Sequence, residues 1–234
     1  KNFLYIYMSS EEYARFAEAS YDMLGSASKQ DRVEGINQKI SDTGFKVDSD
    51  KSNRDMIYLI NDTTGEHHIS LRGTATAKDI VSDANIASGT LTGTKEFNKR
   101  NNRVQRYVKE IPEDAKFTMS GHSLGGMYNQ TILKKSKNVR DRVDEVHTFN
   151  SAANPLVGET KVGKTKKKQL DQKVIHHRTK DDIVSKPFEI NVPFGQVQTY
   201  KTKPMSTKVK VPLKLAGLFN TANAYHAHKL DHFY

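Results

Sequence analysis

One stretch decides the fold of this chain: Lys116-Phe117-Thr118-Met119-Ser120-Gly121-His122-Ser123-Leu124-Gly125-Gly126. Its centre matches the pattern Gly-x-Ser-x-Gly. The residues before this pattern predict a short strand, and residues 127–135 contain neither Gly nor Pro and predict a helix. A strand, a sharp turn and a helix are the setting in which the pattern places a serine hydroxyl at the edge of a sheet.

Ser123 is therefore the candidate nucleophile. A serine hydroxyl attacks a carbonyl carbon only when a base can reach it, and the glycines at 121 and 125 leave room around the turn. The amide of Leu124 begins the helix and is expected to point at the developing oxyanion. Because only three of the five positions are fixed, the pattern on its own also fits a chance match.

A second loop offers another donor for an oxyanion. Residues 67–71 predict a strand that ends in Arg72-Gly73-Thr74. The amide of Thr74 is the candidate donor, because a serine hydrolase of this order takes its second amide from a loop after an earlier strand. The alternative is an ordinary turn in which Thr74 caps the next helix.

The acid and the base should follow the serine along the chain, in that order. Asp182 comes after an apolar stretch and can lie on the loop that leaves a strand, although Asp181 and Asp182 also fit plain turn residues. The candidate base is His228 near the C-terminus, and His226 and His232 lie close to it in the sequence.

These segments together resemble the class 3 lipases, a family of α/β-hydrolases that includes the fungal triacylglycerol lipases. The resemblance covers roughly residues 55–232 and is carried by Arg72-Gly73-Thr74, Asp79, Asp83, residues 118–126 and Asp182-Ile183-Val184. It implies an α/β fold of the α/β-hydrolase type, with a mostly parallel central sheet and helices on both faces. Two positions depart from the family pattern: Ile80 stands where a bulky aromatic is usual, and Ser185 where Pro is frequent.

The resemblance also implies a serine carboxylester hydrolase that acts on lipid or phospholipid esters. Its triad would be Ser123, Asp182 and His228, and its oxyanion amides those of Thr74 and Leu124. In such a triad the histidine takes the serine proton and the aspartate holds the imidazole in the right tautomer. We expect neither a cofactor nor a metal ion, and we favour phospholipid over triacylglycerol because the chain is polar and basic.

A length of 234 residues suits a single α/β domain, with residues 1–50 as a mainly helical N-terminal part. Apolar spacing predicts helices over residues 9–24, 30–41 and 94–109. Residues 55–61 and 67–71 predict strands that a tight turn joins into a hairpin. The alternation of strands and helices after this point indicates a mostly parallel sheet.

The chain has no cysteine, and no apolar run approaches the ~20 residues of a membrane span. It begins at Lys1 rather than Met, which is compatible with the removal of a leader or an upstream domain. Localisation stays open: we expect a soluble protein, with secretion or association with a particle among the options. The oligomeric state is not indicated by the sequence.

The net charge of +10 points to anionic partners. Residues 206–215 alternate basic and apolar side chains, and Pro212 makes them an edge strand or an arm. We interpret them as a peripheral strand that packs on the core. The alternative is a cationic surface that attracts anionic lipid, at roughly 1 kcal/mol per basic residue near the membrane.

Rival functions depend on three other features. Gly158–Thr165 match the P-loop pattern, but no strand runs directly into Gly158 and residues 166–169 predict no packing helix, so we interpret the segment as a basic excursion between core strands. A pI of about 9.5 fits a nucleic-acid-binding module, yet no readout motif is present. A metal site of His226, His228 and His232 would have Lys229 within it.

Residues 75–93 are modestly apolar and contain Gly89 and Gly93, so they fit a mobile lid over the site. A fixed helix beside the site is the alternative.

Overall fold

The computed structural model describes residues 8–73, 94–151, 163–182, 185, 194–203 and 229–233. Its centre is a seven-stranded sheet whose strands lie in the order of the chain. The strands are β1 (Phe45–Val47), β2 (Met56–Asn61), β3 (His67–Leu71), β4 (Phe117–His122), β5 (Glu145–Phe149), β6 (Val174–Thr179) and β7 (Gln196–Tyr200). The first three are antiparallel and β3 to β7 are parallel, which confirms the prediction of a mostly parallel sheet.

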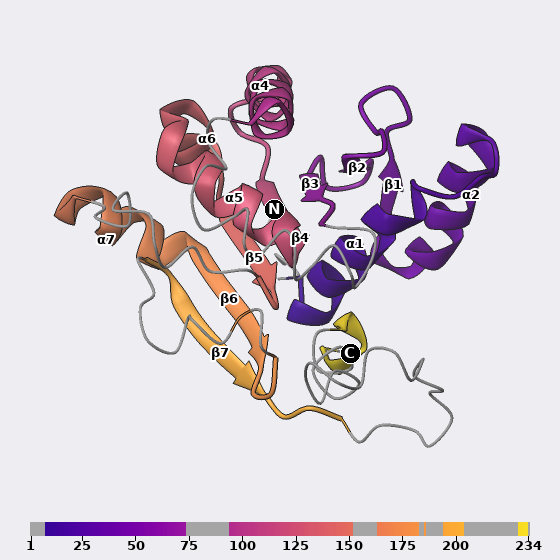
Figure 1. Cartoon of the computed structure of the whole chain (residues 1–234). Coiled ribbons are helices and arrows are strands. Elements are labelled where there is room, and N and C mark those ends of the chain that lie inside the picture. The colour runs from indigo at the N-terminus through magenta and orange to yellow at the C-terminus, as the bar shows by residue number, and fades with distance from the viewer. Residues whose placement is uncertain are drawn as a thin grey trace.

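Helices cover both faces of this sheet (Figure 1). They are α1 (Ser10–Asp22), α2 (Lys29–Lys39), α4 (Lys95–Glu110), α5 (Leu124–Lys135), α6 (Lys137–Arg142) and α7 (Lys164–Lys173), with 3-10 turns η1 (Ser41–Thr43) and η6 (Leu230–His232). The side chains of α1 share one buried cluster with alternate residues of β2, and those of α4 and α5 share another with the residues between. Alternation along a strand sends neighbours to opposite faces, so α1 lies on one face and α4 and α5 on the other.

Local sequence signals explain where several elements begin. Helix α1 starts after Ser9, whose hydroxyl accepts from the amide of Glu12 while the Glu12 carboxylate accepts from the amide of Ser9. This reciprocal capping box satisfies two amides that have no partner inside the helix. The turn between β2 and β3 is closed by Asn61, whose side chain accepts from the amides of Thr63 and Thr64. Both the helix and the hairpin were predicted.

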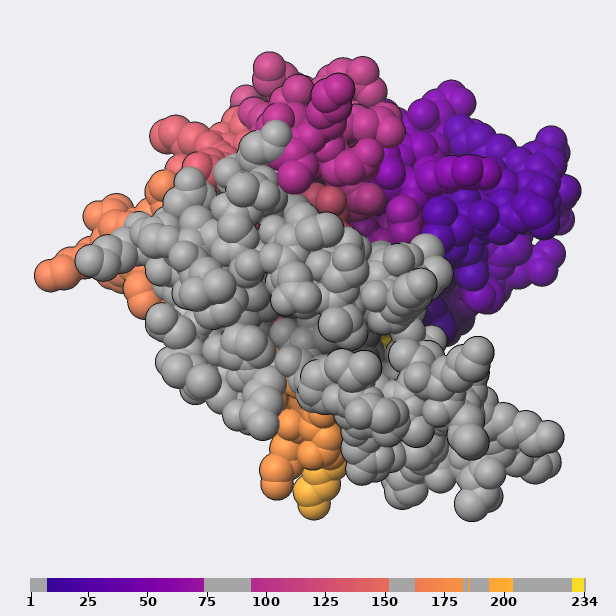
Figure 2. Space-filling view, in the orientation of Figure 1, coloured from indigo at the N-terminus to yellow at the C-terminus, as the bar shows by residue number. Residues whose placement is uncertain are grey.

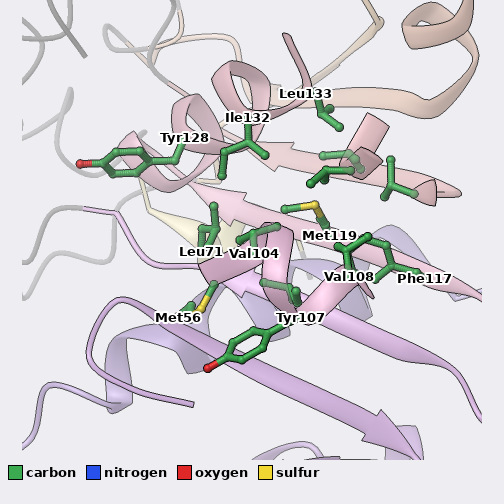
Figure 3. Packing of buried hydrophobic residues seen from close by; sticks show 14 of the residues in the cluster. Met56, Leu71, Val104, Tyr107, Val108, Phe117, Met119, Tyr128, Ile132 and Leu133 are labelled. Atoms are coloured by element: carbon green, nitrogen blue, oxygen red, sulfur yellow. The ribbon is translucent and has the colours of Figure 1, made fainter. Parts of the chain in front are cut away.

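The larger buried cluster holds α4 and α5 to the sheet (Figure 3). Ile132 and Leu133 project from α5, Val104 from α4 and Met119 from β4, and all four are fully buried. Burial of side chains of this size contributes roughly 1.5–3 kcal/mol each. Helix α5, which directly follows Ser123, is therefore held to the sheet.

Helix α7 was not predicted, and the expectation of no packing helix over residues 166–169 was wrong. The segment does lie between two core strands, β5 and β6, as expected. Residues 164–173 are helical although their sequence is almost wholly polar. Tertiary contacts hold them: Leu170 is fully buried, and the Lys173 ammonium donates to carbonyls at Arg140 and Val143. Contacts with a segment that is distant in the sequence give no signal in the local sequence of the helix.

The expected lid at 75–93, the strand at 206–215 and the start of the P-loop-like segment lie outside the described residues. Among the helices that are described, none is long and apolar enough to cross a membrane.

Candidate active site

Ser123 lies between β4 and α5, at the carboxyl end of a central strand. Its backbone has φ 55° and ψ −124°, a region that L-residues rarely adopt. Its amide donates to the carbonyl of Phe149 on β5 at 2.9 Å, which fixes the strained turn to the neighbouring strand. The amide of Leu124 begins α5, where the first amides of a helix have no partner inside it.

The end of β3 lies directly against this turn. A Cβ added at Gly125 would overlap the carbonyl oxygen of Leu71 and lie 2.9 Å from the carbonyl carbon of Arg72. A Cβ added at Gly73 would lie 2.5 Å from the carbonyl oxygen of His122. Only glycine fits at either position, so the backbones of the two candidate oxyanion segments are in contact. Thr74 itself lies outside the described residues.

Asp182 is fully buried on the loop that leaves β6. One carboxylate oxygen accepts from the amide of Ser185 at 2.8 Å, and the Asp182 amide donates to the carbonyl of Thr179 at 3.2 Å. Asp181, in contrast, is exposed and accepts from the hydroxyl of Thr202. Of the two neighbours, Asp182 has the setting of a residue that is held in one orientation.

Asn150 ties the end of β5 to the end of β6. Its amide donates to the carbonyl of His177 and its side-chain oxygen accepts from the amide of Thr179, both at 2.8 Å. Its φ is 40°, and Ser123 is the other non-glycine residue with positive φ in the described part of the chain. Asn150 was not predicted as a site residue, although Asn directly after an apolar strand is one of the few non-glycine residues that adopt this conformation routinely.

Tyr21 of α1 also reaches the site. Its hydroxyl lies 2.9 Å from Nδ1 of His122, the residue before Ser123, and the two rings meet edge to face. An added Cβ at Gly73 would lie 2.5 Å from the same hydroxyl. Helix α1, the end of β3 and the turn at Ser123 therefore meet at one point. No sequence signal distinguished Tyr21 from the other aromatic residues of α1.

His228 and His226 lie outside the described residues. His232 is described and buried, and its Nδ1 accepts from the amide of Lys203 at 3.1 Å. Within the described ranges, no group of three His, Cys, Asp or Glu side chains could hold a metal ion.

The profile of the family Lipase (class 3) matches residues 70–191, which is more than half of the chain. The chain belongs to the class 3 lipase family. The match includes Gly73, Ser123 and Asp182, whereas His228 lies beyond its end. Membership makes the protein a carboxylic ester hydrolase, and the class of ester on which the family acts is lipid.

Solved structures agree on the fold. A lipase from Rhizopus microsporus var. chinensis is 15% identical with a TM-score of 0.51, over 83% of this chain and 74% of that one. The M37 lipase is 13% identical with a TM-score of 0.54, over 95% and 83%. A fungal lipase is 15% identical with a TM-score of 0.51, over 94% and 93%. The sheet and its helices therefore form an α/β-hydrolase fold. No curated protein matches the chain at a significant level.

Proposed function

We propose that this lipase attacks its ester with Ser123, and that Asp182 and His228 complete the triad. The contact between Gly125 and the end of β3 carries the proposal. It holds the end of β3, which directly precedes Thr74, against the start of α5, which begins at Leu124. A strained nucleophile beside two backbone segments is the arrangement that acyl transfer requires.

In the proposed mechanism, His228 takes the proton from the Ser123 hydroxyl as the oxygen attacks the ester carbonyl. The negative charge that develops on the carbonyl oxygen is stabilised by the two amides. The protonated imidazole then gives its proton to the leaving alcohol, and an acyl-enzyme remains. Water attacks this ester in the same way and releases the fatty acid.

The buried carboxylate of Asp182 would orient the imidazole. Its oxygen already accepts one backbone hydrogen bond, from Ser185, which restricts rotation of the carboxylate plane. A buried, ionised aspartate stabilises the imidazolium that forms during the reaction. Asp182 lies five residues past His177, the last residue of β6 that pairs with β5, and so at the same edge of the sheet as Ser123.

For the substrate, the proposal favours a phospholipid over a triacylglycerol. The chain carries 37 basic and 27 acidic residues, so its net charge of +10 attracts an anionic lipid surface.

The test is intact-mass spectrometry after treatment with a fluorophosphonate probe, on the parent chain and on Ser123→Ala and His228→Ala. A single adduct on the parent that is absent from Ser123→Ala and strongly slowed in His228→Ala would support the triad. The same proteins are then given vesicles of phosphatidylglycerol or phosphatidylcholine and an emulsion of triacylglycerol. No adduct and no fatty acid release from the parent would overturn the proposal and favour a degenerate hydrolase fold that binds anionic partners through its basic surface.

A further inference from the structure

Arg100 is a buried cation on a surface helix. Helix α4 lies at the surface of the molecule, where its magenta side chains face solvent (Figure 2). Lys95, Lys99 and Arg106 on this helix are exposed, whereas Arg100 is only 5% exposed. Burying a charge is costly unless it is paired and hydrogen-bonded, so the surroundings of Arg100 must compensate for the loss of water.

The guanidinium of Arg100 holds the backbone at the end of β3. Its Nη1 donates to the carbonyl of Arg72 at 2.6 Å and to the carbonyl of Asp55 at 3.3 Å. Arg72 directly precedes Gly73, the residue that touches the serine turn. The 2.6 Å bond therefore acts on the peptide unit that joins Arg72 to Gly73.

The same guanidinium also contacts the helix that carries the nucleophile. Its central carbon lies 4.3 Å from the centroid of the Tyr128 ring on α5, over the face of the ring. Contacts of a cation with an aromatic face contribute about 0.5–2 kcal/mol, with the larger values for desolvated pairs. Arg100 thus joins the end of β3 to α5, which begins directly after Ser123.

Asp55 balances the charge. Its carboxylate lies 3.5 Å from Nη2 of Arg100, 3.2 Å from Arg103 and 3.1 Å from Lys99. Burial would raise the pKa of Asp55, but the charge of Arg100 and the other two cations outweigh this effect and the pKa is lowered. Asp55 is therefore ionised at neutral pH and keeps Arg100 oriented.

We propose that Arg100 is a positioning residue for the oxyanion hole: it holds the Arg72 carbonyl and the Tyr128 ring at a fixed separation, and so fixes the end of β3 at Gly73 against the turn of Ser123. This inference rests on the proposed function. Oxyanion donors act only when they meet the developing charge at hydrogen-bond distance. A displacement of about 1 Å can lower the rate on the order of 100-fold.

The test compares Arg100→Gln and Arg100→Lys with a matched control, Arg103→Gln. Arg103 pairs with the same Asp55 and with Asn53, but has no bond to the Arg72 carbonyl. Hydrolysis of a short soluble ester, p-nitrophenyl butyrate, is measured per active site, with the sites counted by fluorophosphonate titration. An alkyl boronic acid, which forms a tetrahedral adduct with an active serine, is measured as an inhibitor.

For Arg100→Gln we expect kcat per titrated site to fall about 10- to 100-fold with KM changed less than about threefold. The inhibition constant of the boronic acid should rise by a similar factor, because the adduct needs the same amides. Arg100→Lys should recover little, since one ammonium cannot replace the flat guanidinium over Tyr128. Arg103→Gln should keep kcat and the inhibition constant within about twofold of the parent.

A merely structural role would lower the number of titrated sites and leave both kcat per site and the inhibition constant unchanged. That outcome, in an active parent, would overturn this inference and leave the triad untouched. A parent that neither hydrolyses the ester nor reacts with the probe would overturn the proposed function and this inference together.

Discussion

Gly125 packs against the carbonyl group of Leu71 so closely that no Cβ fits between them. Gly125 lies in the first turn of α5 and Leu71 ends β3, so two residues that are far apart in the sequence are in contact. The contact means that the serine turn and the end of β3 can keep their relative position only while residue 125 has no side chain.

Gly125→Ala should therefore destabilise the protein by about 1–3 kcal/mol and slow fluorophosphonate labelling of Ser123, because the backbone must move apart to admit a methyl group. Urea unfolding and labelling rates measure the two effects. Gly35→Ala is the matched control: Gly35 lies inside α2 with nothing within 4 Å of an added Cβ. That substitution should stabilise the protein by about 0.5–1 kcal/mol. A Gly125→Ala protein with the parent's stability and labelling rate would show that the contact is loose.

Asp182→Asn should lower kcat on a soluble ester by on the order of 10⁴-fold, because an amide favours the wrong imidazole tautomer and cannot stabilise the imidazolium. Asp181→Asn changes the same charge one residue away, at an exposed position, and should change kcat less than about twofold. Rates per titrated site give the comparison. The reverse ranking would assign the acid to Asp181.

Asn150 allows strain to be separated from hydrogen bonding. Asn150→Ala removes the acceptor of the buried Thr179 amide and keeps a Cβ at φ 40°, so it should cost about 1–3 kcal/mol. Asn150→Gly loses the same bond but releases the strain of a positive φ, and should be more stable than Asn150→Ala by about 1 kcal/mol. Thermal and urea unfolding of the two variants provide the measurement. Equal stability of the alanine variant and the parent would mean that the bond to β6 contributes nothing.

Stability should fall as the solution becomes acidic below pH 6.5. Burial lowers the pKa of His176 to about 4 and that of His177 to about 2, and it also lowers the pKa values of His68 and His147. In the unfolded chain a histidine titrates near 6.5, so between that pH and about 4 the unfolded state binds protons that the native state does not. Each such histidine costs up to about 1.4 kcal/mol per pH unit.

Urea unfolding at pH 7.5, 6 and 5 tests this dependence. Four histidines together predict a slope of up to about 5 kcal/mol per pH unit, and stability should be nearly constant above pH 7. His68→Gln should reduce the slope by about a quarter. Its Nδ1 and Nε2 now contact the hydroxyls of Thr118 and Ser120, and an amide can bond to the same groups. A stability that stays flat from pH 7.5 to pH 5 would contradict the lowered pKa values.

Local sequence was sufficient for the elements that local contacts determine. The first helix, the hairpin turn after Asn61 and the strand–turn–helix around Ser123 are each built from residues within a few positions of one another. Their chemistry is visible in the sequence, and the structure confirms all three elements. The family pattern supplied what short motifs do not, namely which of several acidic residues and histidines to connect with the serine.

Contacts between distant segments could not be predicted in the same way. Arg100 is one of six cations on α4, and only its place on the apolar stripe with Phe97 and Val104 marks it as buried. Helix α7 depends on Leu170 and on carbonyl groups of a segment about 30 residues earlier. Tyr21 meets His122 across 101 residues. In each case the partner is brought close only by the assembled sheet.

The order of the strands has a consequence for how the molecule forms during synthesis. Each strand pairs with the one made just before it, so no strand must insert between two that are already joined. The sheet can therefore extend from its first hairpin toward its last strand as the chain emerges, in keeping with the N-to-C order in which chains fold during translation. The turn at Ser123 can form its hydrogen bond to Phe149 once β5 has been synthesised. The loop of Asp182 can form only after β6. Under the proposed mechanism, a chain whose synthesis has reached β5 but not β6 would have its nucleophile in place before the acid that would orient its base.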